Sequence, residues 1–284
     1  MMAETASIVY GVSSMIGWGC GDYLSKRIVG DIGHFRLLLY IQLVSIMPIL
    51  ALAAVFTPTV PSSLTAVALV VAAAACSSCG QFFFYRGLSE GKASVIAPIS
   101  SASPIVAIAL SFIILGETLT IGQGLCIGAA LIGILTMSSR SQSGGQSRGG
   151  IPSALASMFF IGAFFVAFKL ASEEIGQMGA VFFVRSLVLI SLLAVMPLFR
   201  NSSSKGDPKA TSMGAIVVTG LAQFVGFIGA AVGVSVGFVS IVAPLSNSSP
   251  AVTVILAGVF LREKLDRIQK ISVTVVLTAI ILLS

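Results

Sequence analysis

A small number of side chains in this sequence combine a binding or proton-carrying group with a place deep inside an apolar segment. Arg185 is the clearest of them, since it stands about 12 Å into the apolar run 178–199 at the rise of an α-helix. A charged group at the centre of a membrane-spanning helix costs at least about 2.5 kcal/mol, so such groups are rare and are candidates for function. Arg185 therefore either holds an anionic group of a bound molecule or forms a structural pair with a neighbouring side chain.

Asp22, in the stretch GCGDYLSK, is the acidic residue that best fits a place inside an apolar run. A carboxylate shielded from water can bind and release a proton, which makes Asp22 a candidate for proton coupling. Lys26 follows four residues later on the same face of a helix, so a simple ion pair explains Asp22 equally well.

Uncharged polar residues suit a cavity for a small molecule, because such cavities combine apolar walls with a few hydrogen-bonding groups. Ser77, Gln81 and Tyr85 recur every four residues and so share one face of a helix. Hydrogen bonding between helices is the competing role for residues of this kind. The candidate substrate-binding set is Trp18, Gln81, Tyr85, Arg185, Gln223 and Asn247.

The sequence offers no constellation typical of an enzyme or a metal centre. His34 is the only histidine, and the pair of cysteines in CSSC lacks a second pair or a histidine nearby. We therefore expect no enzyme activity, no metal and no cofactor. The net charge of +6 comes from basic residues in short loops between apolar runs, which indicates anchoring at a membrane rather than binding of nucleic acid.

These residues belong to a chain that is too apolar for a soluble protein. Of its 284 residues, 56% are hydrophobic and only 9% are charged, against about 25% charged in an ordinary globular protein. About 20 apolar residues cross the hydrocarbon core of a bilayer as a helix. Ten runs meet that length, namely 5–25, 34–56, 64–86, 93–115, 120–139, 151–171, 178–199, 211–234, 240–261 and 267–284.

The two halves of the chain repeat one another. Pro98 and Pro104 in IAPISSASP match Pro244 and Pro250 in VAPLSNSSP, so the fourth run of each half carries two prolines that interrupt a helix. Neighbouring serines can donate to the carbonyls that lose their partners. Matched breaks in two halves indicate a transport site where the repeats meet, and kinks that serve packing alone are the alternative.

Five runs stand in each half, and because five is odd, the second half enters the membrane from the opposite side. We predict an all-α membrane protein of ten transmembrane helices in two inverted five-helix repeats. The first repeat covers residues 1–139 and the second covers 151–284. Residues 140–150 form a linker, whose Ser/Gly composition is typical of a flexible segment.

Charge predicts the orientation. Fourteen of the 16 Lys and Arg residues lie in or beside the loops after the first, third, fifth, seventh and ninth runs. The positive-inside bias makes that face cytoplasmic and places both termini outside. Glu117 and Glu263 lie at turns just before the last run of each half, where we expect each carboxylate to cap the positive end of a helix.

The whole chain resembles the EamA-type members of the drug/metabolite transporter (DMT) superfamily. The resemblance is carried by WGCGDYLSK in the first run and by GETLTIGQGLCIGAALIG and REKLDRIQKISVTVVLTA after the two proline-bearing runs. It implies a multi-pass protein of the cell membrane, with a central cavity between inverted repeats. It also implies secondary transport by alternating access, as an exporter of a small metabolite such as an amino acid or a similar polar or amphiphilic compound. A membrane-embedded receptor or scaffold without transport activity is the alternative.

Overall fold

The computed structural model describes residues 2–32, 34–90, 96, 99–140, 150–199, 210–260 and 267–283, and all regular structure in these residues is helical. The first half contains α1 (Met2–Ile32), α2 (His34–Phe56), α3 (Leu64–Glu90), α5 (Ser103–Leu110), the π-helical turn η1 (Ser111–Leu115) and α6 (Ile121–Arg140). The second half contains α7 (Ile151–Phe199), α8 (Ala210–Val236), α9 (Val239–Ser246), α10 (Ser249–Phe260) and α11 (Arg267–Leu283).

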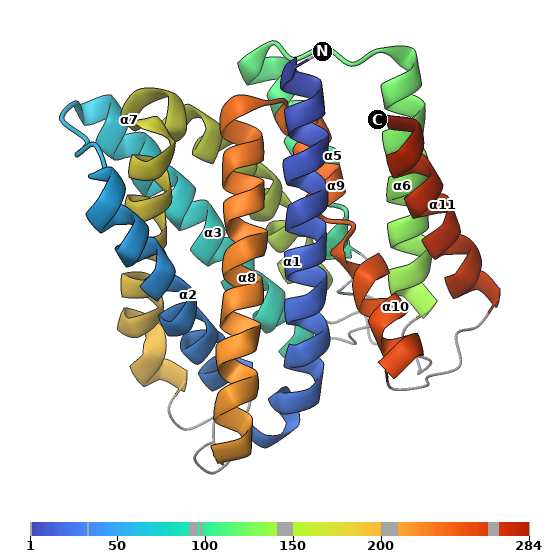
Figure 1. Ribbon diagram of the computed structural model, residues 1–284, viewed down its shortest axis with the longest axis horizontal. Coiled ribbons are helices and arrows are strands. Elements are labelled where there is room, and N and C mark those ends of the chain that lie inside the picture. Colours follow the sequence, from blue (N-terminus) through green and yellow to red (C-terminus); the bar gives the residue numbers. More distant parts are fainter. Residues whose placement is uncertain are drawn as a thin grey trace.

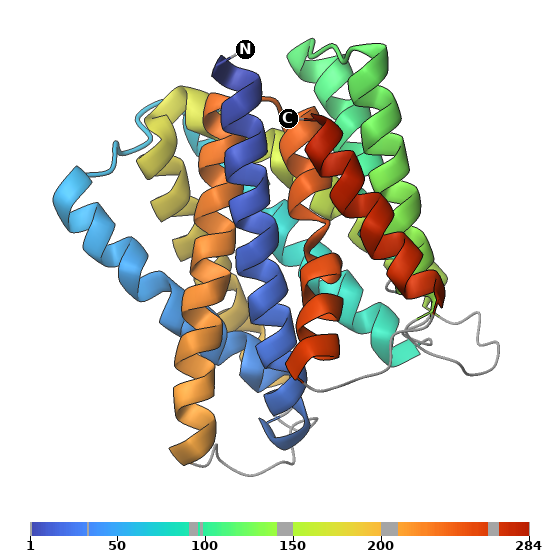
Figure 2. The same cartoon turned by 45° about the vertical axis from the view of Figure 1, so that its right-hand side comes forward.

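The helices form one bundle whose two termini lie at the same end, called the upper end below (Figures 1 and 2). The helix α1 runs down from the N-terminus, α2 returns upward and α3 descends again. The first arm of α7 starts at the lower end and runs upward, so the two halves begin in opposite directions (Figure 1). A path of this kind is expected of two halves inserted upside down relative to each other.

Two glycines with left-handed backbone end helices at the upper end. Gly176 has φ 73° and ψ 160° inside α7, so α7 is two arms that turn back on each other at this residue. Gly116, with φ 65°, follows η1 and donates its N–H to the carbonyl of Ser111. A Cβ at either glycine would meet nothing within 4 Å, so the positive φ is what requires glycine.

Each helix of the first half packs against a helix of the second half. The helix α1 packs on α8 and α3 packs on α7, while α6 packs on α11, α5 on α9 and α2 on α7. The α1–α8 contact is close enough that a Cβ on Gly17 would lie 2.7 Å from the Cα of Gly226. Small residues at such a crossing allow the backbones to approach within van der Waals contact.

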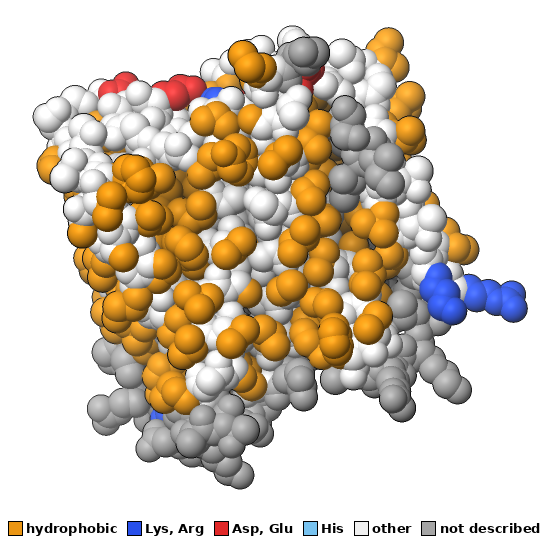
Figure 3. Space-filling view, viewed as in Figure 1, with side chains coloured by type: hydrophobic (Ala, Val, Ile, Leu, Met, Phe, Trp, Pro, Cys, Tyr) orange, Lys and Arg blue, Asp and Glu red, His pale blue; other side chains and the backbone are white. Residues whose placement is uncertain are grey.

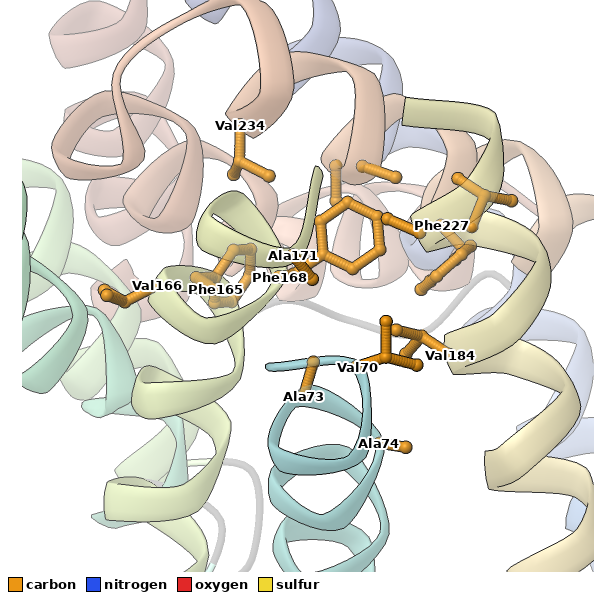
Figure 4. Packing of buried hydrophobic residues seen from close by; sticks show 14 of the residues in the cluster. Val70, Ala73, Ala74, Phe165, Val166, Phe168, Ala171, Val184, Phe227 and Val234 are labelled. Atoms are coloured by element: carbon orange, nitrogen blue, oxygen red, sulfur yellow. The ribbon is translucent and has the colours of Figure 1, made fainter. Parts of the chain in front are cut away.

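The largest apolar core fills the upper half of the bundle. Its members include Val70 and Ala73 near the upper end of α3, Phe168 in the first arm of α7, Val184 in the second arm and Val234 in α8. Figure 4 shows these side chains converging from the three helices. The upper half is thus tightly packed.

The outer surface is apolar in the way that a bilayer requires. Large hydrophobic side chains such as Ile113 and Leu125 are exposed, at 80% and 71% of their area. Figure 3 shows hydrophobic side chains over the whole visible flank, with acidic side chains at its upper edge and basic ones beside the lower end of α11. Among the described residues, five helical segments are long and apolar enough to cross a membrane: Arg36–Phe56, Leu64–Phe84, Ile151–Val195, Met213–Val236 and Val239–Phe260. The protein is therefore a multi-pass integral membrane protein.

Candidate substrate cavity

A cavity of about 520 Å³ lies among α1, α2, α3, α7, α8 and the junction of α9 with α10. Its lining residues lie from mid-height downward: Asp22 and Ser25 belong to the lower half of α1, and Leu37 lies within one turn of the lower end of α2. Phe84 belongs to the last two turns of α3. Because the apolar core closes the upper half, the cavity extends from the centre of the bundle toward its lower end.

The cavity wall carries matched residues from the two halves. At the spacing that relates Pro98 to Pro244, Trp18 corresponds to Phe164, Ser77 to Gln223 and Gln81 to Phe227. All six of these side chains line the cavity. The cavity therefore lies where the two repeats face each other, as a site built on an inverted repeat requires.

Most of the residues singled out in the sequence meet at this cavity. Trp18, Asp22, Gln81, Arg185, Gln223 and Asn247 all line it. Tyr85 lies one turn below Gln81 in α3, and its side chain is outside the described residues. The side chain of Lys26 is also outside them, so the ion pair with Asp22 stays a prediction.

Asp22 joins three helices at the cavity wall. The Nε2 of Gln223 in α8 donates to the Oδ1 of Asp22 at 3.0 Å, and the hydroxyl of Ser249, the first residue of α10, also bonds the carboxylate. A carboxylate is favoured at the N-terminal end of a helix, because the free N–H groups there carry partial positive charge. The contacts of Asp22 hold α1, α8 and α10 together beside the cavity.

Arg185 lies in the second arm of α7 and is only 8% exposed. Its guanidinium carbon sits 4.0 Å from the centre of the Phe227 ring, which attracts a cation through the negative face of the ring. Among the described residues, the Nε of Arg185 has no hydrogen-bond partner and no carboxylate forms an ion pair with this side chain. In the described part of the chain, the neighbour that Arg185 contacts as a cation is thus the Phe227 ring.

The break in the fourth run of the second half comes at Asn247 and Ser248, between α9 and α10. Pro250 lies in the first turn of α10, where a missing N–H costs nothing. Pro244, expected to interrupt the helix, lies inside α9 instead, and the helix ends two residues later, at Ser246. The hydroxyl of Ser248 donates to the carbonyl of Pro244 at 2.9 Å, at the end of α9.

The corresponding break in the first half lies at Ala102, a turn that precedes α5 and its Pro104. Pro98 lies outside the described residues. The hydroxyl of Ser103 in α5 donates to the Oδ1 of Asn247 at 3.2 Å, so the two breaks meet across the centre of the bundle.

Glu117 acts as a helix cap, but on a helix in the other half. Its two carboxylate oxygens accept hydrogen bonds from the backbone N–H groups of Val239 and Ser240, at 2.7 and 2.8 Å, where α9 begins. The next helix along the chain is α6, which Glu117 does not cap, because the turn after η1 carries its side chain across to α9. The hydroxyl of Ser7 in α1 accepts from the N–H of Phe238 beside it, at 2.7 Å. Glu263 lies outside the described residues.

Gln42 is a cavity residue that the sequence analysis missed. It lies in α2, its side chain is 4% exposed, and its Nε2 has no hydrogen-bond partner among the described residues. The sequence does indicate a buried polar role for this residue, since Gln42 is a lone amide in the apolar stretch LYIQLVSIMP. Phe227 was missed as well, because one phenylalanine among many in an apolar helix carries no distinguishing pattern.

This chain belongs to the EamA-like transporter family, whose sequence model matches it twice, over residues 5–139 and 148–284. The family consists of membrane transporters of the drug/metabolite type, which implies a small-molecule substrate and a lipid bilayer as surroundings. An uncharacterised protein of Methanocaldococcus jannaschii, MJ1333.1, is 26% identical over 132 residues, which are 46% of this chain and 96% of that protein. A crystal structure of a protein of 15% identity superposes with a TM-score of 0.81, covering 98% of this chain and 96% of the other, and so shares its fold.

Proposed function

We propose that this protein is a secondary transporter that exports a small metabolite, an amino acid or a similar polar or amphiphilic compound, by alternating access. The observation that carries the proposal is the cavity of about 520 Å³ between the two repeats, with Asp22, Arg185 and a few amides set in apolar and aromatic walls. Such a wall suits a small molecule that has both polar and apolar parts.

The proposed architecture has ten transmembrane helices, in two inverted five-helix repeats of residues 1–139 and 151–284 around the linker 140–150. Its support is the opposite starting direction of the two halves (Figures 1 and 2) and the contacts of α1 with α8 and of α3 with α7. Under the inversion, the α1–α8 contact is equivalent to that of the first arm of α7 with α3. The length of MJ1333.1, about that of one repeat, agrees with this division.

The lower end is the proposed cytoplasmic end in the cell membrane, and both termini are outside. The positive-inside bias supports this orientation, because the Lys- and Arg-rich connections lie between helices that end at the lower end. The cavity extends toward that end while the upper half is packed. A substrate would then enter the site from the cytoplasm, which is what an exporter needs.

Proton coupling through Asp22 is the proposed source of energy. Asp22 lines the cavity, and its partners are Gln223 in α8 and Ser249 at the start of α10, directly after the α9–α10 break. Protonation of the carboxylate would weaken these contacts where the bundle must rearrange. Substrate and proton would thereby act on the same junction.

Flux into proteoliposomes tests the proposal. Purified protein would be reconstituted, and uptake of a labelled mixture of the twenty common amino acids would be measured with an imposed proton gradient. We expect uptake above that of protein-free vesicles, which disappears when the gradient is collapsed. Absence of flux for the amino acids and for a wider pool of labelled metabolites would favour a receptor or scaffold.

Accessibility labelling tests the inversion separately. Single cysteines would replace Glu90, at the lower end of α3, and Val236, at the upper end of α8, in a variant without the four native cysteines. An impermeant thiol reagent should reach the two positions from opposite sides of the membrane. Labelling of both from one side would exclude the inverted arrangement.

A further inference from the structure

Two residues that line the cavity each carry a buried donor without a partner among the described residues. The Nε of Arg185 and the Nε2 of Gln42 make no hydrogen bond within the described part of the chain. Arg185 is only 8% exposed and Gln42 only 4%. Both side chains line the cavity. Buried polar groups in native proteins are nearly always satisfied, so unpaired groups at a cavity indicate that a ligand supplies the partner.

The two donors come from adjacent helices. Gln42 lies on α2 and Arg185 on the second arm of α7, and these helices pack against each other. The Phe227 ring covers one face of the Arg185 guanidinium at 4.0 Å. Phe227 is itself held by Phe168, whose ring lies edge-on at 6.0 Å and is 1% exposed. The guanidinium thus rests on a ring that is itself packed in the core, and its Nε–H is without a partner among the described residues.

The guanidinium of Arg185 has no direct ion-pair partner in the described part of the chain. The other charged group at the cavity, Asp22, is bonded to Gln223 and Ser249. A guanidinium has only donors, and its planar fork matches the two oxygens of a carboxylate. The amide nitrogen of Gln42 can donate to the same anion.

We infer that Arg185 and Gln42 form a subsite that binds the carboxylate of the transported molecule. The aromatic walls near it, among them Trp18 and Phe164, then take the apolar body of that molecule. This inference rests on the proposed function, since it names the chemical group by which the same cavity recognises its substrate. It predicts that a carboxylate is required and that an amine or an amide of the same shape is rejected.

The experiment uses the isobutyl group of leucine with different end groups. Trp18 is the only tryptophan and lines the cavity, so its fluorescence reports binding to the purified full-length protein. The probes are L-leucine, 4-methylpentanoate, L-leucinamide and 3-methylbutylamine. We expect both carboxylates to bind more tightly than the amide and the amine, by roughly ten-fold or more, as the loss of one charged hydrogen-bonded contact implies.

Variants assign the preference to the two residues. Arg185→Gln removes the charge, Arg185→Lys keeps it without the planar fork, and Gln42→Glu places a repelling carboxylate beside the anion. All three should weaken the carboxylates and leave the amine unchanged or improved, with Gln42→Met intermediate. Thr274→Val on α11 is the control, because Thr274 donates to the carbonyl of Lys270 in its own helix and is not among the residues that line the cavity.

The outcomes separate this inference from the proposed function. Equal binding of leucine and leucinamide, no binding of either carboxylate at any soluble concentration, or a preference that survives Gln42→Glu and Arg185→Lys would overturn the subsite. Flux of an amine without any carboxylate preference would overturn the subsite and leave transport standing. Carboxylate binding that depends on Arg185 but produces no flux would support the subsite and overturn the proposal of transport.

Discussion

The carboxylate of Glu117 lies 2.7 Å from the backbone nitrogen of Val239, a residue 122 positions later in the chain. Glu117 is 8% exposed, and its second oxygen accepts from Ser240. A charged acceptor at the first N–H groups of α9 satisfies donors that the helix itself leaves unpaired. This contact ties the end of the first half's fourth helical run to the start of the second half's, at the closed upper end.

Replacing Glu117 should loosen that end. Glu117→Gln keeps one acceptor oxygen and turns the other into a donor that faces an N–H group, so we expect a loss of roughly 1.5–3 kcal/mol, the range for one hydrogen bond to a charged group. The thermal unfolding midpoint in detergent should fall. Glu173→Gln is the control, because Glu173 is exposed and lies 3.8 Å from Lys169. Equal midpoints for the two variants would show that the cap contributes nothing.

The α1–α8 crossing should reject any side chain at Gly17. A Cβ there would press on the backbone of Gly226, which cannot move aside as a flexible side chain can. We expect Gly17→Ala to lower stability by roughly 1–3 kcal/mol, the usual cost of overpacking, and to lower the amount of protein in the membrane. Gly128→Ala is a matched change on α6, where a Cβ meets nothing within 4 Å. A normal level of Gly17→Ala protein would contradict the close crossing.

Gln81 should matter for transport more than for stability. Its recorded hydrogen bond, from Nε2 to the hydroxyl of Ser77, is long at 3.5 Å, so truncation removes little that holds the fold. We expect Gln81→Ala to reduce flux roughly two- to ten-fold, the range for one neutral hydrogen bond, at unchanged membrane abundance. Ser78→Ala is the comparison, because Ser78 bonds Ser191 at 2.7 Å and links α3 to α7. A parallel loss of Gln81→Ala protein would indicate packing instead.

Asn247 is expected to affect both transport and stability. Its Oδ1 accepts from Ser103 across the two helix breaks, and its Nδ2 donates to the carbonyl of Ala243. Asn247→Ala should therefore lower flux with membrane abundance near normal but with a reduced unfolding midpoint. Rescue of the midpoint, but not of flux, by the paired change Ser103→Ala would separate the two roles. Unchanged flux would remove Asn247 from the binding set.

Asp22 can be tested without removing its contacts. In Asp22→Asn the side-chain oxygen can still accept from Gln223, but the group no longer exchanges a proton at neutral pH. We expect flux that no longer responds to an imposed proton gradient, measured in proteoliposomes. Gln223→Ala keeps the carboxylate and should reduce flux while leaving it gradient-dependent. A gradient response that persists in Asp22→Asn would assign coupling to another group.

Several features could be predicted from particular residues. The repeated prolines and the odd number of apolar runs in each half predict helices that start in opposite directions, which Figures 1 and 2 show. Deep polar residues such as Arg185 and Gln223 predict a shared cavity, since lipid cannot solvate them. The sequence was a poor guide at Pro244. This proline is expected to interrupt a helix, yet α9 continues through it to Ser246.

The sequence by itself determined that the chain is a duplicated bundle of apolar helices with a few buried polar groups, because burial in lipid constrains composition and periodicity locally. Tertiary structure alone decided which of those groups meet. Arg185 lies against the ring of Phe227, Glu117 caps a helix of the other half, and Gln42 lies in the cavity wall. Such partners are set by the crossing of helices far apart in the chain, and no spacing along one helix encodes them.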